Sequence, residues 1–132
     1  MADNAGSRRL PGKPGRVSRD GHSFAVEAWV GRKVTGWPLG RFDIETDGLR
    51  VRLSFPWFIA RSADKDTITS VSVRKSIAGL WCARFEDSQE RLGDVHVHLV
   101  TRAQRVIDEL HQRGYAVVDP KTGEQLVRLP KR

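Results

Sequence analysis

The segment that most constrains the fold is residues 42–53, in which two runs of alternating apolar and charged side chains flank Asp47 and Gly48. Asp-Gly between such runs is typical of a two-residue β-hairpin turn, because both central positions adopt positive φ. The register of that turn places apolar pairs on one face and opposite charges on the other, which predicts an antiparallel hairpin with one buried face. The predicted pairs are Ile44 with Val51, Phe42 with Leu53, Glu45 with Arg50, and Asp43 with Arg52.

Five other segments complete a β-rich pattern. Residues 24–30 alternate with period two and predict a strand that ends at Gly31, followed by a loop through Gly36, Trp37, Pro38 and Gly40. After Pro56, residues 57–60 predict a short strand at a sheet edge or corner, and residues 62–66 a loop. The β-branched segment 67–75 predicts a strand with a bulge near Thr69. Residues 80–85 and 94–99 predict the last two strands, joined by a polar loop over residues 86–93, which makes seven strands in series.

Residues 101–113 predict a helix. Thr101 and Gln104 have the spacing of a capping box, and Gly114 is placed to end the helix with a Schellman motif in which Tyr115 contacts Leu110. One apolar face is expected to pack on the sheet rather than in solvent. That face consists of Ala103, Val106, Ile107 and Leu110. Residues 115–118 are then expected to run back along the sheet.

The chain has 132 residues, the length of one domain, and its net charge of +7 is unevenly distributed. Residues 1–22 carry five basic against two acidic side chains, and residues 120–132 carry four against one. Residues 23–119 carry 14 against 13 and are close to neutral. We therefore expect a disordered basic tail over 1–22, a folded domain over 23–119 and a basic C-terminal tail over 120–132.

The composition argues for a soluble protein in a reducing compartment. No apolar run approaches the roughly 20 residues that cross a bilayer, and the N-terminus lacks the apolar stretch of a secretory signal. Cys82 is the single cysteine, so an internal disulfide or a cysteine-rich zinc module is excluded. These features predict a cytoplasmic location.

Seven antiparallel strands followed by one amphipathic helix resemble the pleckstrin-homology-like barrel. The resemblance covers about residues 24–118 and rests on the order of the elements, including the hairpin between the second and third strands. The runs 40–44, 47–49 and 110–114 also resemble uncharacterised bacterial members of that group. The resemblance implies a mainly β fold, a seven-stranded antiparallel barrel or sandwich capped by the C-terminal helix. It does not imply one activity, because this fold hosts lipid-binding, peptide-binding and purely structural roles.

In the members of this family that bind phosphoinositides, basic residues at the end of the first strand and on the second hold the head group. Arg32, Lys33 and Arg41 match the first part of that pattern, whereas Asp43 stands where the next basic residue is expected. These cations could equally be ordinary solvated charges. Trp37 lies in the loop beside them and is the candidate for a contact with a partner, whereas Trp29, Trp57 and Trp81 lie in predicted strands and are expected to pack.

Candidate chemistry elsewhere is limited. His96 and His98 lie two apart on a strand with Asp94, so they could hold a metal, or they could form a solvent face opposite Val95 and Val97. Cys82 lies mid-strand, which favours a packed thiol over a nucleophile. No nucleophile elbow, phosphate-binding glycine loop or dinucleotide fingerprint is present. We therefore expect no enzymatic activity, no catalytic residue, no metal site and no cofactor.

These observations predict a non-enzymatic binding or scaffold module that engages a protein partner through a sheet edge or the Trp37 loop. The candidate partner-binding residues are Arg32, Lys33, Trp37 and Arg41. The alternative is electrostatic binding of an anionic lipid surface or nucleic acid through the basic tails.

Overall fold

The computed structural model describes residues 21–55, 57–77 and 79–129 of the chain. The strands are β1 (His22–Val30), β2 (Lys33–Glu45), β3 (Gly48–Leu53), β4 (Ile59–Asp64), β5 (Ile68–Lys75), β6 (Trp81–Asp87), β7 (Val95–Leu99) and β8 (Val117–Val118). The helices are the single 3₁₀ turn η1 (Lys65–Thr67) and the α-helix α2 (Ala103–Gln112). The expected tail over residues 1–22 falls outside the described residues up to position 20, and Pro56 also lies outside them.

The strands form one sheet in the order β4-β3-β2-β1-β7-β6-β5-β8. All pairs from β4 to β5 are antiparallel, and the two-residue β8 joins β5 in parallel. The expected mainly β fold with one C-terminal helix is confirmed. The sheet differs from a seven-stranded closed barrel, because it has eight strands of mixed direction and its end strands β4 and β8 are not paired with each other in the described part of the chain.

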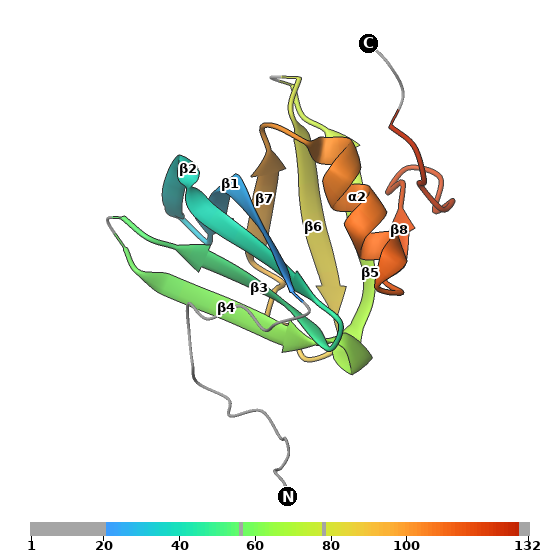
Figure 1. Cartoon of the computed structure of the whole chain (residues 1–132), viewed down its shortest axis with the longest axis horizontal. Helices are drawn as coiled ribbons and strands as arrows, with labels where there is room; N and C mark the ends of the chain where they lie inside the picture. The colour runs from blue at the N-terminus through green and yellow to red at the C-terminus, as the bar shows by residue number, and fades with distance from the viewer. Residues whose placement is uncertain (1–20, 56, 78, 130–132) are drawn as a thin grey trace, which may run out of the picture.

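The sheet curls around its core. Figure 1 shows β1 to β4 running across β5 to β7, with α2 lying beside β5, β6 and β8. The curl brings together strands that are not neighbours in the sheet, since the rings of Phe42 on β2 and Phe85 on β6 lie 5.5 Å apart, edge to face. Alternate positions of the strands and one face of α2 fill the interior. Its largest fully buried side chains include Phe42, Ile44, Leu49, Leu53, Ile107 and Leu110.

The hairpin is present, but its predicted register is wrong by two residues. Glu45 pairs with Gly48 and Ile44 with Leu49, so the turn is centred on Thr46 and Asp47 rather than on Asp47 and Gly48. A shift of two keeps every side chain on its predicted face. The expected charge pairs still form, now diagonally, with Arg52 Nε 2.7 Å from Asp43 and Arg50 Nη2 3.9 Å from Glu45. The pairs adopted are Ile44 with Leu49, Phe42 with Val51, and Asp43 with Arg50.

The expected loop around Trp37 is instead a bulge inside β2. Val26 of β1 pairs with Gly40 and Ala28 with Thr35, so residues 36–39 stand out from the ladder opposite Glu27 alone. The Trp37–Pro38 peptide bond is cis. Gly40 permits the return to the ladder, because a Cβ there would lie 2.7 Å from the Val26 carbonyl oxygen.

Two expectations around β4 and β5 had different outcomes. The segment 62–66 was expected to be a loop, but residues 62–64 continue β4 and Lys65 begins η1. Pairing with β3 extends the strand through these polar positions, from Leu53 with Ile59 to Gly48 with Asp64. The bulge near Thr69 is confirmed by the register shift between Ile68 and Ser70.

The helix and its C-terminal end form as predicted, and its N-terminal cap does not. Val106, Ile107 and Leu110 are buried, and the Tyr115 N–H donates to the Leu110 carbonyl at 2.9 Å beyond Gly114, which has φ of +86°. The capping box is wrong, because the N-cap is Arg102 in the left-handed region without a side-chain cap. The Gln104 side chain instead bonds the backbone of the C-terminal segment.

The C-terminal segment is part of the folded body as far as Leu129. Residues 117–118 run back along β5 as expected. The chain was then expected to fray from Pro120, but Leu126 N–H donates to Val117 O at 2.8 Å, and Leu126 and Leu129 pack against the core. Gln104 fastens this segment to α2 by accepting from Leu129 N–H at 2.7 Å.

Candidate partner-binding surface

Five large apolar side chains gather at one end of the molecule without being buried. Two project from the β2 bulge and three from the β3–β4 loop, and we call them the aromatic tip. Their exposed fractions are 47% for Trp37, 49% for Leu39, 64% for Phe55, 45% for Trp57 and 75% for Phe58. Single exposed apolar side chains are ordinary, whereas five on two segments make this a candidate interaction surface.

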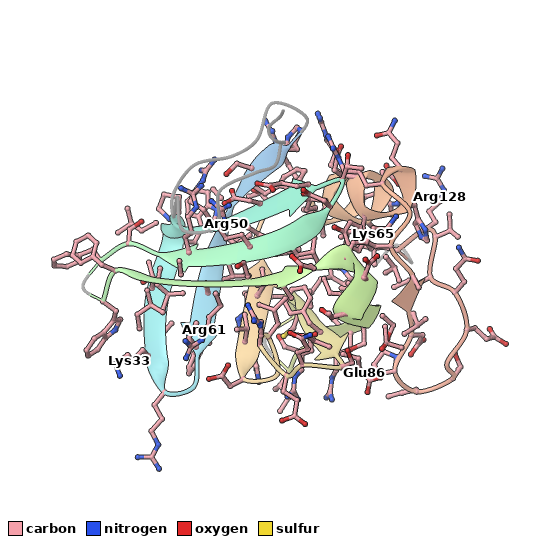
Figure 2. The ribbon with its side chains drawn as sticks, turned by 90° about the horizontal axis from the view of Figure 1, so that it is seen from below. Lys33, Arg50, Arg61, Lys65, Glu86 and Arg128 are labelled. Atoms are coloured by element: carbon pink, nitrogen blue, oxygen red, sulfur yellow. The ribbon has the colours of Figure 1, made fainter. Side chains whose placement is uncertain are left out.

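Contacts between the two segments hold the tip together. The Thr35 hydroxyl, which is fully buried in β2, donates to the Phe55 carbonyl at 3.1 Å. The Lys33 ammonium lies 5.3 Å from the centre of the Trp57 ring, a cation–π contact. In Figure 2, Lys33 lies beside the projecting β3–β4 loop at the opposite end of the molecule from Arg128. The bulge and the loop, which are far apart in the sequence, therefore make one surface.

Of the four sequence-predicted residues, Trp37 belongs to the tip and Lys33 lies against its Trp57 ring. Arg32, in the turn between β1 and β2, precedes Lys33 at the start of β2, and both are exposed. Arg41 lies beyond the bulge and is turned to the start of β1, where its guanidinium donates to Ser23 Oγ at 3.0 Å. We call Lys33, which contacts the tip, and the neighbouring Arg32 the cationic rim, which Arg41 does not join.

The surroundings of Asp43 give it a structural role. Its side chain is fully buried, and Arg52 holds both carboxylate oxygens, with Nη2 at 2.9 Å from Oδ1 and Nε at 2.7 Å from Oδ2. One hydrogen bond, from Nη2 to Oδ1, and the guanidinium charge beside Oδ2 compensate the burial of the carboxylate. Asp43 thus stabilises the far half of β2 and is not part of the tip.

His96 and His98 do not assemble a metal site with Asp94. In the described part of the chain no three histidine, cysteine or acidic side chains are grouped to hold a metal ion. His98 Nδ1 lies 3.7 Å from Glu27 Oε2, and the same carboxylate oxygen accepts from Trp29 Nε1 at 2.7 Å. Asp94 instead lies 3.7 Å from Arg61. Burial, and then the charge of Arg84, lowers the pKa of His96, so the ring is neutral at pH 7.

Cys82 is a packed thiol, as predicted. It is a buried free cysteine in β6, paired across the ladder with Arg74 and His98. Burial raises the pKa of the thiol, although Arg84 and Arg74 oppose that shift. A protonated, buried thiol is a poor nucleophile.

Sequence reasoning found Trp37 but missed Leu39, Phe55 and Phe58, and it was wrong about Trp57. Trp57 was assigned to a strand and expected to pack, whereas β4 begins at Ile59 and Trp57 is nearly half exposed. The available signal was the run of three aromatic residues around Pro56 over residues 55–58. Such a run cannot alternate between faces, and proline prevents it from pairing as a central strand.

No protein-family model matches the sequence, and a search of the curated proteins returned no match. None of the helices in the described residues has both the length and the apolar character needed to span a membrane.

Proposed function

We propose that this protein is a non-enzymatic binding module that engages a protein partner through the aromatic tip. The observation that carries the proposal is the exposure of five large apolar side chains on two segments that contacts hold side by side. Full burial of such a side chain is worth about 1.5–3 kcal/mol, and these side chains, which are 45% to 75% exposed, forgo part of it. Association with a partner recovers that free energy.

The composition of the tip matches the centre of a protein interface. Tryptophan, phenylalanine and arginine are enriched at such centres, and a few buried aromatic side chains dominate binding. Trp37, Trp57, Phe55 and Phe58 are the aromatic side chains, and Arg32 and Lys33 form a polar rim. A partner with an apolar hollow bordered by acidic side chains is complementary to this arrangement.

The architecture supports a pleckstrin-homology-like fold as the framework of the module. The seven strands β1 to β7 pair antiparallel in one continuous order, and α2 follows them in the sequence. The contact between Phe42 and Phe85 brings the two halves of the curled sheet face to face, as a barrel or sandwich requires. In this interpretation β8 is an addition at the edge of β5.

An anionic lipid surface is the second candidate, and the cationic rim favours it. Trp37 and Trp57 beside Arg32 and Lys33 also suit the interface of a bilayer, where aromatic rings and cations meet head groups. The protein partner is preferred because Arg41 is bonded to Ser23 and does not join the rim. The basic tails of the alternative lie partly outside the described residues. Lys121 and Arg128 belong to the segment that packs beside α2.

A capture experiment with matched variants tests the proposal. The full chain, immobilised, is compared with a Trp37→Ala/Phe58→Ala variant and with an Ile77→Ala/Val127→Ala variant. The second variant removes two exposed apolar side chains that lie elsewhere, 107% and 54% exposed. We expect the tip variant to lose a specific partner by roughly tenfold or more in affinity and the control variant to retain it. Equal capture by all three proteins would refute the proposal.

The same proteins distinguish protein from lipid. We expect no sedimentation of the full chain with vesicles of an anionic phospholipid at physiological salt. Sedimentation that falls with salt and disappears in Arg32→Glu/Lys33→Glu would assign the tip to a membrane instead.

A further inference from the structure

A second surface lies along β4, at the edge of this strand that does not pair with β3. A groove of about 1070 Å³ separates this edge from the β6–β7 loop. Ala60, Arg61 and Ser62 line one wall, and Thr69 and residues of the segment 86–94 line the other, with Phe85 between them. Figure 2 shows Arg61 on the β4 side and Glu86 on the opposite side.

The pairing of β4 with β3 shows which backbone groups face the groove. Lys65 N–H donates to Asp47 O at 2.9 Å, and the Ala63 carbonyl oxygen lies so close to Gly48 that a Cβ there would be 2.7 Å away. Residues 61, 63 and 65 therefore direct their backbone groups toward β3. By the alternation of a strand, Ala60 and Ser62 direct theirs into the groove, where no strand pairs with β4 in the described part of the chain.

The edge has none of the usual protection at these two positions. Natural edge strands discourage pairing with lysine, proline or a bulge. Ala60 and Ser62 have small side chains, and β4 pairs with β3 without a register shift. An extended segment can therefore approach the backbone closely.

The far wall of the groove is rigidly built. The Asp87 carboxylate accepts the N–H groups of Gln89 at 3.1 Å, Arg91 at 2.7 Å and Leu92 at 3.3 Å, which closes the loop. Ser88 N–H donates to Thr67 O at 2.8 Å and ties the loop to the start of β5. The far wall is thus held in place before anything binds, which lowers the entropic cost of association.

The groove is acidic, in contrast to the chain as a whole. Four carboxylates line it, from Glu86, Asp87, Glu90 and Asp94, against the guanidinium groups of Arg61 and Arg91. Asp87 is occupied by the loop and Asp94 lies 3.7 Å from Arg61. Glu86, Glu90 and Arg91 remain exposed, which leaves one net negative charge at the groove. Complementarity therefore calls for a cationic occupant.

We propose that this groove binds a basic, extended segment of a protein partner, which adds to β4 as a further strand. Main-chain hydrogen bonds to Ala60 and Ser62 would supply affinity, and lysine or arginine side chains beside Glu86 and Glu90 would supply selectivity. A second copy of this chain would bring β3 with its β4, whereas a partner segment brings one strand alone, and the cationic occupant that the groove favours need not come from a second copy. This site is separate from the aromatic tip and does not rest on its function.

The test uses the full chain and a fluorescein-labelled peptide in which lysine alternates with valine, with a glutamate-for-lysine peptide as control. We expect the lysine peptide to bind at least tenfold more tightly than the control. Glu86→Lys/Glu90→Lys should weaken binding by roughly tenfold or more, corresponding to about 1.4 kcal/mol. The matched reversal Asp108→Lys/Glu124→Lys, on α2 and the C-terminal segment, should leave binding unchanged. Equal binding of both peptides, or equal loss in both variants, would overturn the proposal.

Strand addition has its own signature. Ser62→Pro removes an outward N–H at an edge, where proline is tolerated, and should abolish peptide binding, whereas Ser62→Ala should retain it. In the unmodified chain, the peptide should slow hydrogen exchange at the amides of Ala60 and Ser62. Arg61 and Ala63, which already face β3, should change little. Unchanged exchange at Ala60 and Ser62, or a dimer of the chain that Ser62→Pro dissociates, would contradict a bound partner segment.

Discussion

The two ends of β2 differ in what their side chains do. From Phe42 to Glu45 every position is buried, with apolar side chains in the core and Asp43 held by Arg52 on the opposite face. From Gly36 to Leu39 every position is exposed, in a bulge that leaves the ladder. One strand thus stabilises the fold at one end and presents unburied aromatic surface at the other. The exposed end contributes little buried surface, which is why the proposed function is placed there.

Replacement of buried and exposed phenylalanine residues gives the largest expected difference. Phe42→Ala should destabilise the protein by about 3–5 kcal/mol, because it removes a fully buried ring that packs against Phe85. Phe58→Ala should change stability by no more than about 0.5 kcal/mol, because its side chain is 75% exposed. Urea unfolding of both variants measures this. Similar losses in the two would mean that the tip supports the fold and would remove the contrast.

The buried ion pair gives the next largest effect. Arg52→Met should cost about 2–4 kcal/mol, because the fully buried Asp43 carboxylate loses the guanidinium that contacts both of its oxygens. Thermal unfolding measures the stability of Arg52→Met and of the control Arg32→Met, whose substitution in the exposed turn before β2 should leave stability close to that of the parent. If Arg52→Met were as stable as the parent, the buried end of β2 would not depend on its charges.

The sequence was sufficient to predict most of the fold, because the fold depends on periodic patterns. Period two predicted β1 and the bulge in β5, and helical spacing predicted the buried face of α2. The hairpin register was wrong because a shift of two residues leaves each side chain on the same face, so the pattern cannot distinguish the two. The N-cap was wrong because Gln104 bonds the C-terminal segment, a contact between distant residues.

The candidate sites were less accessible to sequence reasoning. Trp37 was identified because a glycine and proline context marked it as lying outside regular pairing. The proximity of the Trp37 bulge to residues 55–58 depends on contacts between distant segments, such as Thr35 with Phe55 and Lys33 with Trp57. The acidic groove depends on the curl of the sheet, which brings Arg61 near Asp94. The charge count over residues 23–119 predicted a near-neutral domain and could not show that several of its carboxylates lie around one groove.

The four tryptophans allow the most direct test of the central claim, that the aromatic tip is the partner-binding surface. Trp37 and Trp57 belong to the tip, whereas Trp29 donates to Glu27 on the sheet and Trp81 lies beside Lys75. The measurement is the four indole N–H signals in nitrogen-15 NMR spectra, recorded without and with the captured partner. We predict that the signals of Trp37 and Trp57 shift or broaden while those of Trp29 and Trp81 stay in place. Changes confined to Trp29 and Trp81 would contradict the account.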